Sequence, residues 1–516
     1  ALGISGKRRE SQHPTHTRSL PLLAGRDFAG SCGILGLAVE LEVRLAPREG
    51  EPSAVHARDE GELAEVLGRI PKGAWHVSVV DCRRFALERE ALAHEWGLSP
   101  RPPEGLPDDG YAVLVVGPDP LPGRELDAEE LWRDRFFTMR AKRAGPSVIP
   151  AEAVVPARAL PEFLRALGEK GFVSEASLVR GGEAVVVALR LSDSRRRSFY
   201  LEYAESLWVL RAASRVGGRP YSTGLLFSSY AREVLGEERL ERIRALKREL
   251  DPRGLLNPGK VLPRPWSIST AVRAASAASP ILRTLSRLLR GRLGGSGLEY
   301  DSLACSWCGQ CEAVCPVFSA LPWPEASARG RLLAVRLGRV EEAALSFFLC
   351  TTCGACEARC QVGIPLVRRW LEARGRLVSR GLELEYFRLV RENVLSSGNS
   401  WGAPAEVRWR WLPDARRGRL LVWVGCWDSL LFPEIPRALY EMARDAGEEP
   451  FFLGPSEECC GLPLLLGGYR REFEEVARRN VRRVAESGAE RVLVHCPGCL
   501  TVLREEYPRL AREEGV

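Results

Sequence analysis

The chain has 516 residues, a formal net charge of +7 and an apolar share of 45%, which is enough for about three domains of roughly 150 residues with real cores. Its 74 basic side chains stand against 67 acidic ones, a mild excess that does not indicate nucleic-acid binding. We find no apolar run of about eighteen residues and no secretory signal, and we expect a cytoplasmic protein.

Residues 1–263 alternate strand-like runs with helix-like runs. The segments YAVLVVG (111–117) and EAVVVALRL (183–191) have the pattern of strands, and LGEERLERIRALKREL (235–250) has that of a helix. The run ends at DPRGLLNPGKVLP, where proline and glycine mark the end of a helix. This alternation predicts an α+β domain.

The two ends of this region resemble FAD-linked oxidases of the vanillyl-alcohol oxidase superfamily. FAGSCGILGLAVELEVRLAPRE (28–49) is similar to the end of their flavin-binding domain, and DPRGLLNPGKVL (251–262) to their C-terminal signature, with RDRFFTMRAKRAGPSVIPAEAVVP between them as in the substrate-cap domain. The resemblance implies the tail of an FAD-binding domain at 1–45 and a ferredoxin-like α+β cap domain at 46–263. The residues that it places at FAD are Gly30, Ser31, Gly33, Gly36, Asn257 and Lys260.

The sequence departs from that family at three places. Cys32 and Ile34 replace the usual Glu and Thr, and RPYSTGLLFSSY follows Gly217 and Gly218 where the family has a Glu-His-Gly segment. The glycine-rich loop for the FAD pyrophosphate is expected upstream of this chain. We therefore expect a companion chain to supply that half, or a fragmentary gene product.

The missing histidine leaves Tyr221 as the candidate for taking the substrate hydroxyl proton. A phenol stays protonated near neutrality unless it is strongly perturbed, so a packing role is the competing interpretation. Arg140, Lys142 and Arg219 are candidates for binding a substrate carboxylate, with arginine suited to bidentate contact, and surface ion pairs are the alternative. Cys32 is expected to be a small buried residue.

Residues 264–297 form a linker with a basic amphipathic second half. Such a helix can lie on the inner face of a membrane or dock on a partner, and the competing interpretation is a helix packed against its own protein. The stripe consists of Ile281, Leu282, Leu285, Leu288 and Leu289, with Arg283, Arg287, Arg290 and Arg292 among them.

Residues 298–395 are predicted to be helical and carry two C-x2-C-x2-C-x3-C motifs, CSWCGQCEAVCP and CTTCGACEARCQ. Three cysteines on one turn can grip three irons of a cube, and the fourth completes the neighbouring cube. One four-iron cluster is therefore assigned to Cys305, Cys308, Cys311 and Cys360, and the other to Cys350, Cys353, Cys356 and Cys315. Structural zinc is the alternative, although zinc sites use paired C-x-x-C units. Gln361 replaces the usual proline, which is not a ligand.

Residues 418–516, after a connector at 396–417, alternate strands and helices as in a parallel α/β unit. Cysteines are expected to end all three strands, one at the first and two at each of the others, and ligands bind beyond the carboxyl ends of parallel strands, so we expect five thiols in one crevice. A disulfide between adjacent cysteines would be strained. The five are Cys426, Cys459, Cys460, Cys496 and Cys499.

The spacing C-x32-C-C-x35-C-x-x-C resembles the cysteine-rich CCG domain of heterodisulfide reductases and of the iron-sulfur subunits of glycolate oxidase, lactate-utilisation and anaerobic glycerol-3-phosphate dehydrogenase systems. The resemblance implies a non-cubane iron-sulfur cluster in which the paired cysteines bridge irons, with zinc or an empty site as alternatives. His495 is either a ligand or an ordinary polar residue. That family usually carries two such repeats, so a companion chain is expected to supply the second.

The three resemblances together imply a fused 2-hydroxy-acid dehydrogenase of the glycolate or D-lactate type. FAD would take hydride from the substrate, and electrons would pass through two 4Fe-4S clusters to an acceptor such as a quinone, a ferredoxin or a disulfide. The alternative is an electron-transfer or heterodisulfide-reductase-like subunit whose flavin-domain remnant is not catalytic. A third interpretation takes every cysteine group as structural zinc.

Overall fold

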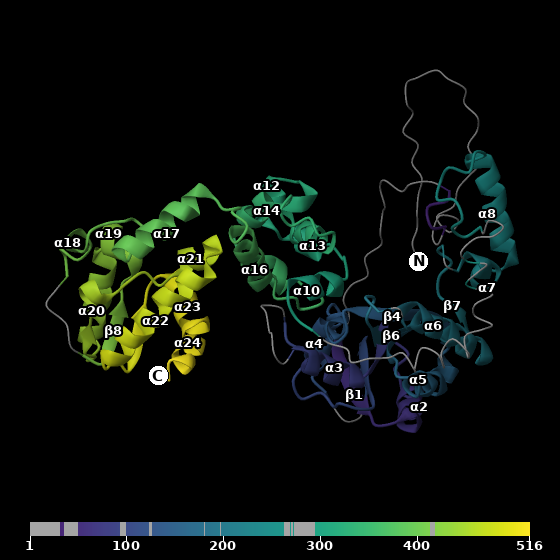
Figure 1. Cartoon of the computed structure of the whole chain (residues 1–516). Helices are drawn as coiled ribbons and strands as arrows, with labels where there is room; N and C mark the ends of the chain where they lie inside the picture. Colours follow the sequence, from purple (N-terminus) through teal and green to yellow (C-terminus); the bar gives the residue numbers. More distant parts are fainter. Residues whose placement is uncertain are drawn as a thin grey trace, which may run out of the picture. The chain divides into compact units, whose positions relative to one another are not determined.

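The computed structural model describes residues 31–35, 50–92, 100–122, 126–179, 181–196, 198–225, 227–262, 269, 272, 295–412 and 418–515. The chain divides into two compact units (Figure 1), which we describe separately. The first unit consists of Ala1–Ser296, Leu303–Ser306 and Gln361–Ile364, and the second of Gly297–Ser302, Trp307–Cys360 and Pro365–Val516.

The first unit is built on an antiparallel sheet, seven-stranded within the described residues, with the order β1-β3-β2-β5-β6-β4-β7. Both strand-like runs of the sequence lie in it, as β3 and β6. The strands are β1 Glu51–Ala57, β2 His76–Asp81, β3 Tyr111–Gly117, β4 Ser147–Pro156, β5 Val173–Val179, β6 Glu183–Ser192 and β7 Arg219–Pro220.

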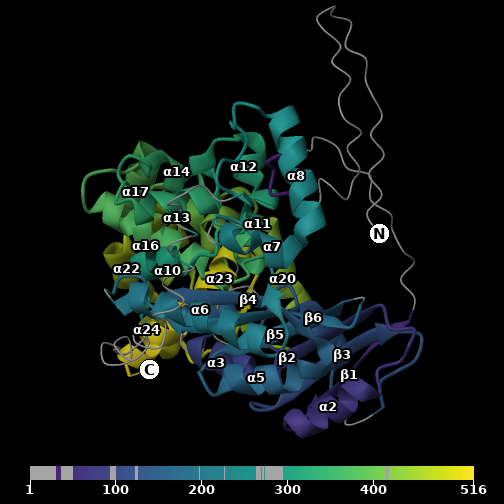
Figure 2. The same ribbon diagram turned by 90° about the vertical axis from the view of Figure 1, so that its right-hand side faces the viewer.

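Helices cover both faces of this sheet because alternate residues of its strands are apolar on each side. Val113 and Val115 of β3 pack with α2, α5 and α6, whereas Ala112 and Leu114 pack on the opposite face with α3 and α4. Figure 2 labels β1 to β6, with α2 and α5 beside them. The helices are α2 Glu60–Gly68, α3 Arg83–Leu92, α4 Ala128–Asp134, α5 Leu160–Gly168 and α6 Ser198–Arg215, with the short turns η1 Arg140–Arg143 and η2 Ala157–Ala159.

A smaller core joins the two segments that resemble flavin oxidases. Ile34 and Leu35 pack with Ile243 and Leu246 of α8 and with Val261. The helix expected at 235–250 is divided at Gly236, whose φ of +77° favours glycine. The elements are η3 Ser228–Tyr230, α7 Ala231–Leu235 and α8 Glu237–Leu250.

The N-terminal half of the second unit is helical, as predicted. Each thiol motif spans a short helix, α11 in the first and α15 in the second, and the longer helices pack around them. The elements of this region are α10 Leu298–Ala304, α11 Gln310–Ala313, α12 Pro316–Ala320, η4 Pro324–Ala326, α13 Ala328–Arg336, α14 Ala344–Leu349, α15 Ala355–Ala358, α16 Leu366–Val378 and α17 Glu385–Ser397.

The C-terminal half contains the predicted parallel sheet, three-stranded within the described residues and ordered β10-β8-β9. The two long helices expected between its strands are present as α20 and α22. The elements are α18 Ala405–Arg408, β8 Leu420–Trp423, α19 Gly425–Leu431, α20 Glu434–Asp445, β9 Pro450–Phe451, η5 Gly454–Ser456, α21 Leu462–Gly467, α22 Arg470–Glu486, β10 Arg491–Val494, α23 Pro497–Glu505 and α24 Tyr507–Glu513.

The amphipathic stripe of the linker, from Ile281 to Arg292, lies outside the described residues. Among the helices that are described, none combines the length and apolar character needed to cross a bilayer.

Candidate metal centres and flavin-facing segments

A pocket in the second unit is lined by cysteines from both four-cysteine motifs. Cys350, Cys353 and Cys356 come from the second motif, and Cys315 comes from the end of the first. Cys350 ends α14, Cys356 lies on α15, and Cys315 caps the N-terminus of α12. The four side chains that the sequence groups together therefore face one space.

Both motifs fold into the same tight loop. The residue before the second cysteine has a left-handed backbone in each loop, Trp307 with φ of 58° and Thr352 with φ of 55°, and the following glycines, Gly309 and Gly354, have φ of 81° and 76°. A left-handed backbone costs energy for Trp and Thr, so its presence in both loops indicates that the loop shape matters. In the second loop the Thr352 N–H donates to Cys350 Sγ at 3.4 Å.

The thiols around this pocket also interact electrostatically. Burial raises the pKa of the Cys356 thiol, and charge on Cys350, Cys311 and Cys315 raises that pKa further. Thiolates crowded in this way are stabilised by a positively charged metal group, which requires them deprotonated. The donor set fits an iron-sulfur cluster, and Cys311 brings the first motif beside the second.

The other members of the first motif lie on or near the same short helices. Cys308 is exposed, Cys311 lies on α11, and Cys360 follows α15, which contacts α11. Cys305 belongs to the first unit, where its carbonyl accepts a hydrogen bond from Lys142 Nζ at 2.7 Å. Within the described residues no three His, Cys, Asp or Glu side chains are grouped tightly enough to hold a single metal ion.

Two buried arginines beside the pocket were not anticipated from the sequence. Arg331 lines the pocket, and Arg374 Nη2 donates to the Cys350 carbonyl at 2.5 Å. Burial lowers the pKa of Arg374 to about 10, the charge of Arg331 lowers it too, and Cys350 opposes both. Helical spacing could have predicted the burial of Arg374, because it follows Trp370 by four residues on the buried stripe of α16.

The five thiols of the C-terminal domain form one continuous chain of contacts. Hydrogen-bond contacts run from Cys426 to Cys459, then to Cys460, to Cys499 and to Cys496. The expectation that Cys426, Cys459 and Cys460 end strands is wrong. Cys426 lies on α19 after β8, and Cys459 and Cys460 follow β9 and η5. All five thiols nevertheless come together beyond the carboxyl ends of the strands.

Burial and mutual contact separate the proton affinities of these thiols. The hydrogen bond with Cys426 lowers the pKa of Cys459, but contact with Cys460 and burial outweigh it and raise that pKa to about 12. Contact with Cys459 and burial raise the pKa of Cys426 well above its usual value. The hydrogen bond from Cys499 and backbone N–H groups at the start of α23 lower the pKa of Cys496 to about 6. Without metal the group thus carries its negative charge mainly at one end, whereas metal binding would deprotonate the rest.

A buried ion pair holds two of the cysteine-bearing loops together. Glu457 accepts hydrogen bonds from the backbone N–H groups of Val424 at 3.0 Å and Gly425 at 2.7 Å, and it pairs with Arg408 at 3.2 Å. Gly425 has φ of +76°, and a Cβ there would lie 3.2 Å from Cys499 Sγ. This turn therefore requires glycine for the approach of the sulfur. Sequence motifs held no signal for Arg408 or Glu457.

His495 lies beside the five-thiol group but faces a carboxylate. Its Nδ1 is 2.9 Å from Asp428 Oδ2, and its side chain is 45% exposed. The ring is held by that contact, which agrees with the interpretation of His495 as a polar residue at a strand end.

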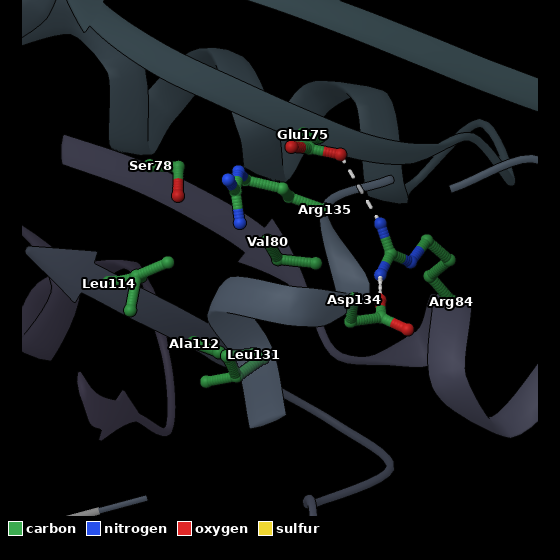
Figure 3. Close-up of a pocket in the computed structure, with 9 residues that line it drawn as sticks. All are labelled: Ser78, Val80, Arg84, Ala112, Leu114, Leu131, Asp134, Arg135 and Glu175. Atoms are coloured by element: carbon green, nitrogen blue, oxygen red, sulfur yellow. Dashed lines mark hydrogen bonds and ion pairs between the residues drawn. The ribbon is translucent and has the colours of Figure 1, made fainter. Parts of the chain in front are cut away.

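Arg140 lies in a buried charge network of the first unit. Its guanidinium pairs with Asp134 and, at 3.3 Å, with Glu88. Arg84 pairs with Asp134 and Glu175 along a narrow pocket (Figure 3). Two arginines thus face three carboxylates, so the charge that was expected to receive a substrate carboxylate is already neutralised by the protein.

The other proposed substrate contacts lie on separate elements. Lys142 Nζ binds the Cys305 carbonyl. Arg219 pairs with Glu183 at 3.0 Å, which is the ion-pair alternative. Tyr221 follows β7 and is 49% exposed. The described contacts of these residues give no common substrate pocket.

The two flavin-related segments are joined by side chains that donate hydrogen bonds to backbone carbonyls. Asn257 Nδ2 donates to the Cys32 carbonyl at 2.8 Å, and Lys247 Nζ donates to the Ile34 carbonyl at 2.8 Å and pairs with Asp251 at 2.5 Å. Lys247 and Asp251 were not singled out from the sequence. Both signature segments are thus joined at one place.

The remaining flavin candidates fall into two groups. Gly30 and Gly36 lie outside the described residues. Ser31 is buried and its hydroxyl has no hydrogen-bond partner within the described structure, which fits a place beside an absent group. Gly33 has a positive φ of 70°, and the Lys260 N–H donates to the Asn257 carbonyl at 3.3 Å.

Three family models match the chain in order. Residues 121–261 match the C-terminal domain of FAD-linked oxidases, residues 301–364 match a 4Fe-4S dicluster domain, and residues 420–504 match a cysteine-rich domain. These matches confirm the three resemblances drawn from the sequence.

Curated relatives match separate parts of the chain. The glycolate oxidase subunit GlcD of Bacillus subtilis is 22% identical over 46% of this chain and 56% of its own length. Lactate utilization protein A of Exiguobacterium is 29% identical over 18% of this chain and 38% of its own length. A subunit of the dihydromethanophenazine:CoB--CoM heterodisulfide reductase of Methanosarcina acetivorans is 29% identical over 21% of this chain and 28% of its own length. The chain thus spans only part of each relative.

Proposed function

Because the chain carries the C-terminal domain of FAD-linked oxidases, a 4Fe-4S dicluster domain and a cysteine-rich domain, we propose that it is a flavin- and iron-sulfur-dependent oxidoreductase acting on a 2-hydroxy acid such as D-lactate or glycolate. The observation that carries the redox part is the pocket lined by Cys315 together with Cys350, Cys353 and Cys356. Ligand exchange between two motifs is typical of paired four-iron clusters.

The ligands follow from that grouping. Cys350, Cys353, Cys356 and Cys315 hold one 4Fe-4S cluster, and Cys305, Cys308, Cys311 and Cys360 hold the other. The electrostatic effect of Cys311 on Cys356 and the packing of α11 against α15 support single-electron transfer between adjacent clusters. The five-thiol group of the C-terminal domain holds a non-cubane iron-sulfur cluster or another metal.

FAD would supply the two-electron chemistry by accepting hydride from the substrate carbon. The residues that would hold it are Ser31, Gly33, Asn257 and Lys260, together with Gly30 and Gly36, and a companion chain would supply the remaining FAD-binding half. Tyr221 is the proposed proton acceptor and Lys142 a proposed contact of the substrate carboxylate. Arg140 is buried in ion pairs with Glu88 and Asp134, so its role is to hold α3, α4 and η1 of this domain together.

The electron acceptor is a quinone, a ferredoxin or a disulfide, in the cytoplasm or at the inner face of the membrane. Other relatives are named as an EtfAB:quinone oxidoreductase and as subunits of heterodisulfide and fumarate reductases. Those names support a partner chain for this protein as well.

One observation favours a second function. The chain lacks the family's Glu-His-Gly segment after Gly218, and four of the relatives are reductase subunits. On this view the protein is an electron-transfer or heterodisulfide-reductase-like subunit, and its flavin-domain remnant serves as a scaffold.

Anaerobic purification separates the two functions. We expect a brown protein that contains iron and sulfide, with flavin that is bleached by D-lactate or glycolate when the companion chain is present. Iron and sulfide without flavin, in a complex that still accepts electrons, would support the electron-transfer role instead. A colourless preparation that contains zinc and little iron would refute both proposals.

A further inference from the structure

Two arginines are buried without a counter-ion in the helical part of the second unit. Arg331 on α13 is 1% exposed and Arg374 on α16 is 2% exposed. Within the described structure their donors reach neutral acceptors only, and neither forms an ion pair with a carboxylate. This arrangement is unusual because a buried charge normally has a charged partner.

The hydrogen bonds of these arginines go to neutral oxygen atoms and leave the guanidinium charge without an anionic partner. Arg331 donates to the Ser346 carbonyl at 2.9 Å and to the Ala326 carbonyl at 2.9 Å. Arg374 donates to the carbonyls of Phe347 at 2.9 Å and Leu466 at 2.7 Å. An uncompensated charge in the interior costs several kcal/mol, so a negatively charged group is expected within reach.

The thiol pocket is the adjacent group that can supply this negative charge. Arg331 lines it directly, and Arg374 binds the carbonyl of Cys350, one of its four cysteines. One buried carboxylate, Glu357, also acts on Cys356 and accepts a hydrogen bond from the Val367 N–H at 2.9 Å. Two guanidinium charges against one carboxylate leave a net positive charge beside the pocket.

The cations at the other thiol loop are less buried. Arg329 pairs with Glu312 at 2.7 Å, Lys142 Nζ donates to the Cys305 carbonyl at 2.7 Å from a half-buried position, and the exposed Arg336 lies 5.7 Å from the centre of the Trp307 ring. The two loops share one backbone shape but differ in how deeply the neighbouring cations are buried.

We propose that Arg331 and Arg374 are the buried countercharge of the iron-sulfur cluster held by Cys315, Cys350, Cys353 and Cys356, and that they raise its reduction potential. Reduction adds one negative charge to such a cluster, and fixed positive charge in a low-dielectric interior stabilises the reduced state. A higher potential would favour residence of an electron on this cluster. Arg374 Nη1 also donates to the Leu466 carbonyl of α21, the helix that begins after Cys460.

This inference rests on the proposed cluster ligands and not on the substrate. The test is a redox titration of the anaerobically purified full-length chain, followed by the paramagnetic resonance of each reduced cluster. The variants are Arg331→Gln and Arg374→Gln, which remove charge, and Arg331→Lys and Arg374→Lys, which keep it. The matched control is Arg388→Gln, the same change at an exposed position of α17.

We expect each glutamine variant to lower the reduced-to-oxidised ratio of one cluster about tenfold at fixed potential, a shift of about 59 mV for a one-electron couple. The lysine variants should restore most of this ratio, and Arg388→Gln should change it little because its charge is solvated. Unchanged potentials in both glutamine variants, or an equal shift in Arg388→Gln, would overturn the proposal.

Glu357→Gln keeps the test decisive if the arginine variants fail to assemble clusters. Removing the opposing carboxylate while keeping an oxygen for the Val367 N–H should raise the same potential, and an unchanged or lower potential would overturn the proposal. A protein with two clusters but no flavin would refute the 2-hydroxy-acid function and leave this test intact. A protein without iron would refute the inference together with its cluster ligands.

Discussion

Glu457 has more effect on the five-thiol group than its lack of a sequence signature suggests. It immediately precedes the loop of Cys459, and its carboxylate binds the turn that leads to Cys426. Burial raises the pKa of Glu457, while Arg408 and the two backbone donors oppose that shift. A single side chain thus fixes the relative position of two cysteine-bearing loops.

Replacement of this carboxylate should destabilise the C-terminal domain. We expect Glu457→Ala to cost about 3–5 kcal/mol of unfolding free energy, because it leaves the buried Arg408 charge unpaired, and Glu457→Gln to cost less. Urea titration with tryptophan fluorescence and metal content would measure both. Glu490→Gln, in the exposed pair with Arg419, is the control and should be neutral. An unfolding midpoint unchanged in Glu457→Ala would contradict this role.

At the level of elements, α3, α4, η1 and β5 of the first unit bring three carboxyl groups against two buried arginines. Burial raises the pKa of Glu88 to about 7, and the charge of Asp134 raises it as well, against the opposing effect of the arginines. A carboxyl whose pKa is higher in the folded state binds its proton more tightly there. Its stabilisation is complete below the unfolded pKa and is lost as pH rises through the folded pKa.

The stability of the first unit should therefore fall between about pH 4.5 and pH 7 by at most ~3 kcal/mol from this group. Glu88→Gln should flatten that part of the profile because glutamine does not titrate. The variant also leaves two arginines against two carboxylates. Denaturation at a series of pH values measures the effect, with Glu65→Gln in an exposed pair as control. A profile as steep in Glu88→Gln as in the parent would rule out this origin.

Sequence patterns predicted those features of the fold and of the sites that depend on residues close together along the chain. Strand and helix periodicity located β3, β6, α20 and α22, and cysteine spacing grouped the thiols because metal ligands on one loop are local in sequence. The charge partners could not be predicted in this way. Arg140, Arg331 and Arg374 look like surface residues by type, and only packing between distant elements reveals that they are buried.

At the scale of the whole molecule, the five-thiol group and the pocket of Cys315 and Cys350 belong to the second unit, whereas the flavin-related segments belong to the first. Metal binding contributes to the folding free energy of the unit that supplies the thiol ligands. Loss of metal should therefore destabilise mainly the second unit, which holds most of them. The two units should therefore respond differently to removal of iron.

Anaerobic chelation or oxidative removal of iron should lower the midpoint of one calorimetric transition and leave the other nearly unchanged. The reason is that buried thiols lose the metal that stabilised their charge, while the seven-stranded sheet keeps its core. Reconstitution with iron and sulfide should restore the lost transition. A uniform shift of all transitions would mean that the units unfold as one.

The first unit does not end at the linker, because it also includes Leu303–Ser306 and Gln361–Ile364. Lys142 Nζ binds the Cys305 carbonyl at 2.7 Å, and Arg143 Nη1 binds the Gly363 carbonyl at 3.0 Å, so two short stretches of the 4Fe-4S dicluster domain fold with the oxidase domain. Severing the chain at the linker would therefore separate two stretches of sequence from the compact unit to which they belong, and the N-terminal piece should lose stability. Domain limits drawn from sequence families and from folding thus differ in this chain.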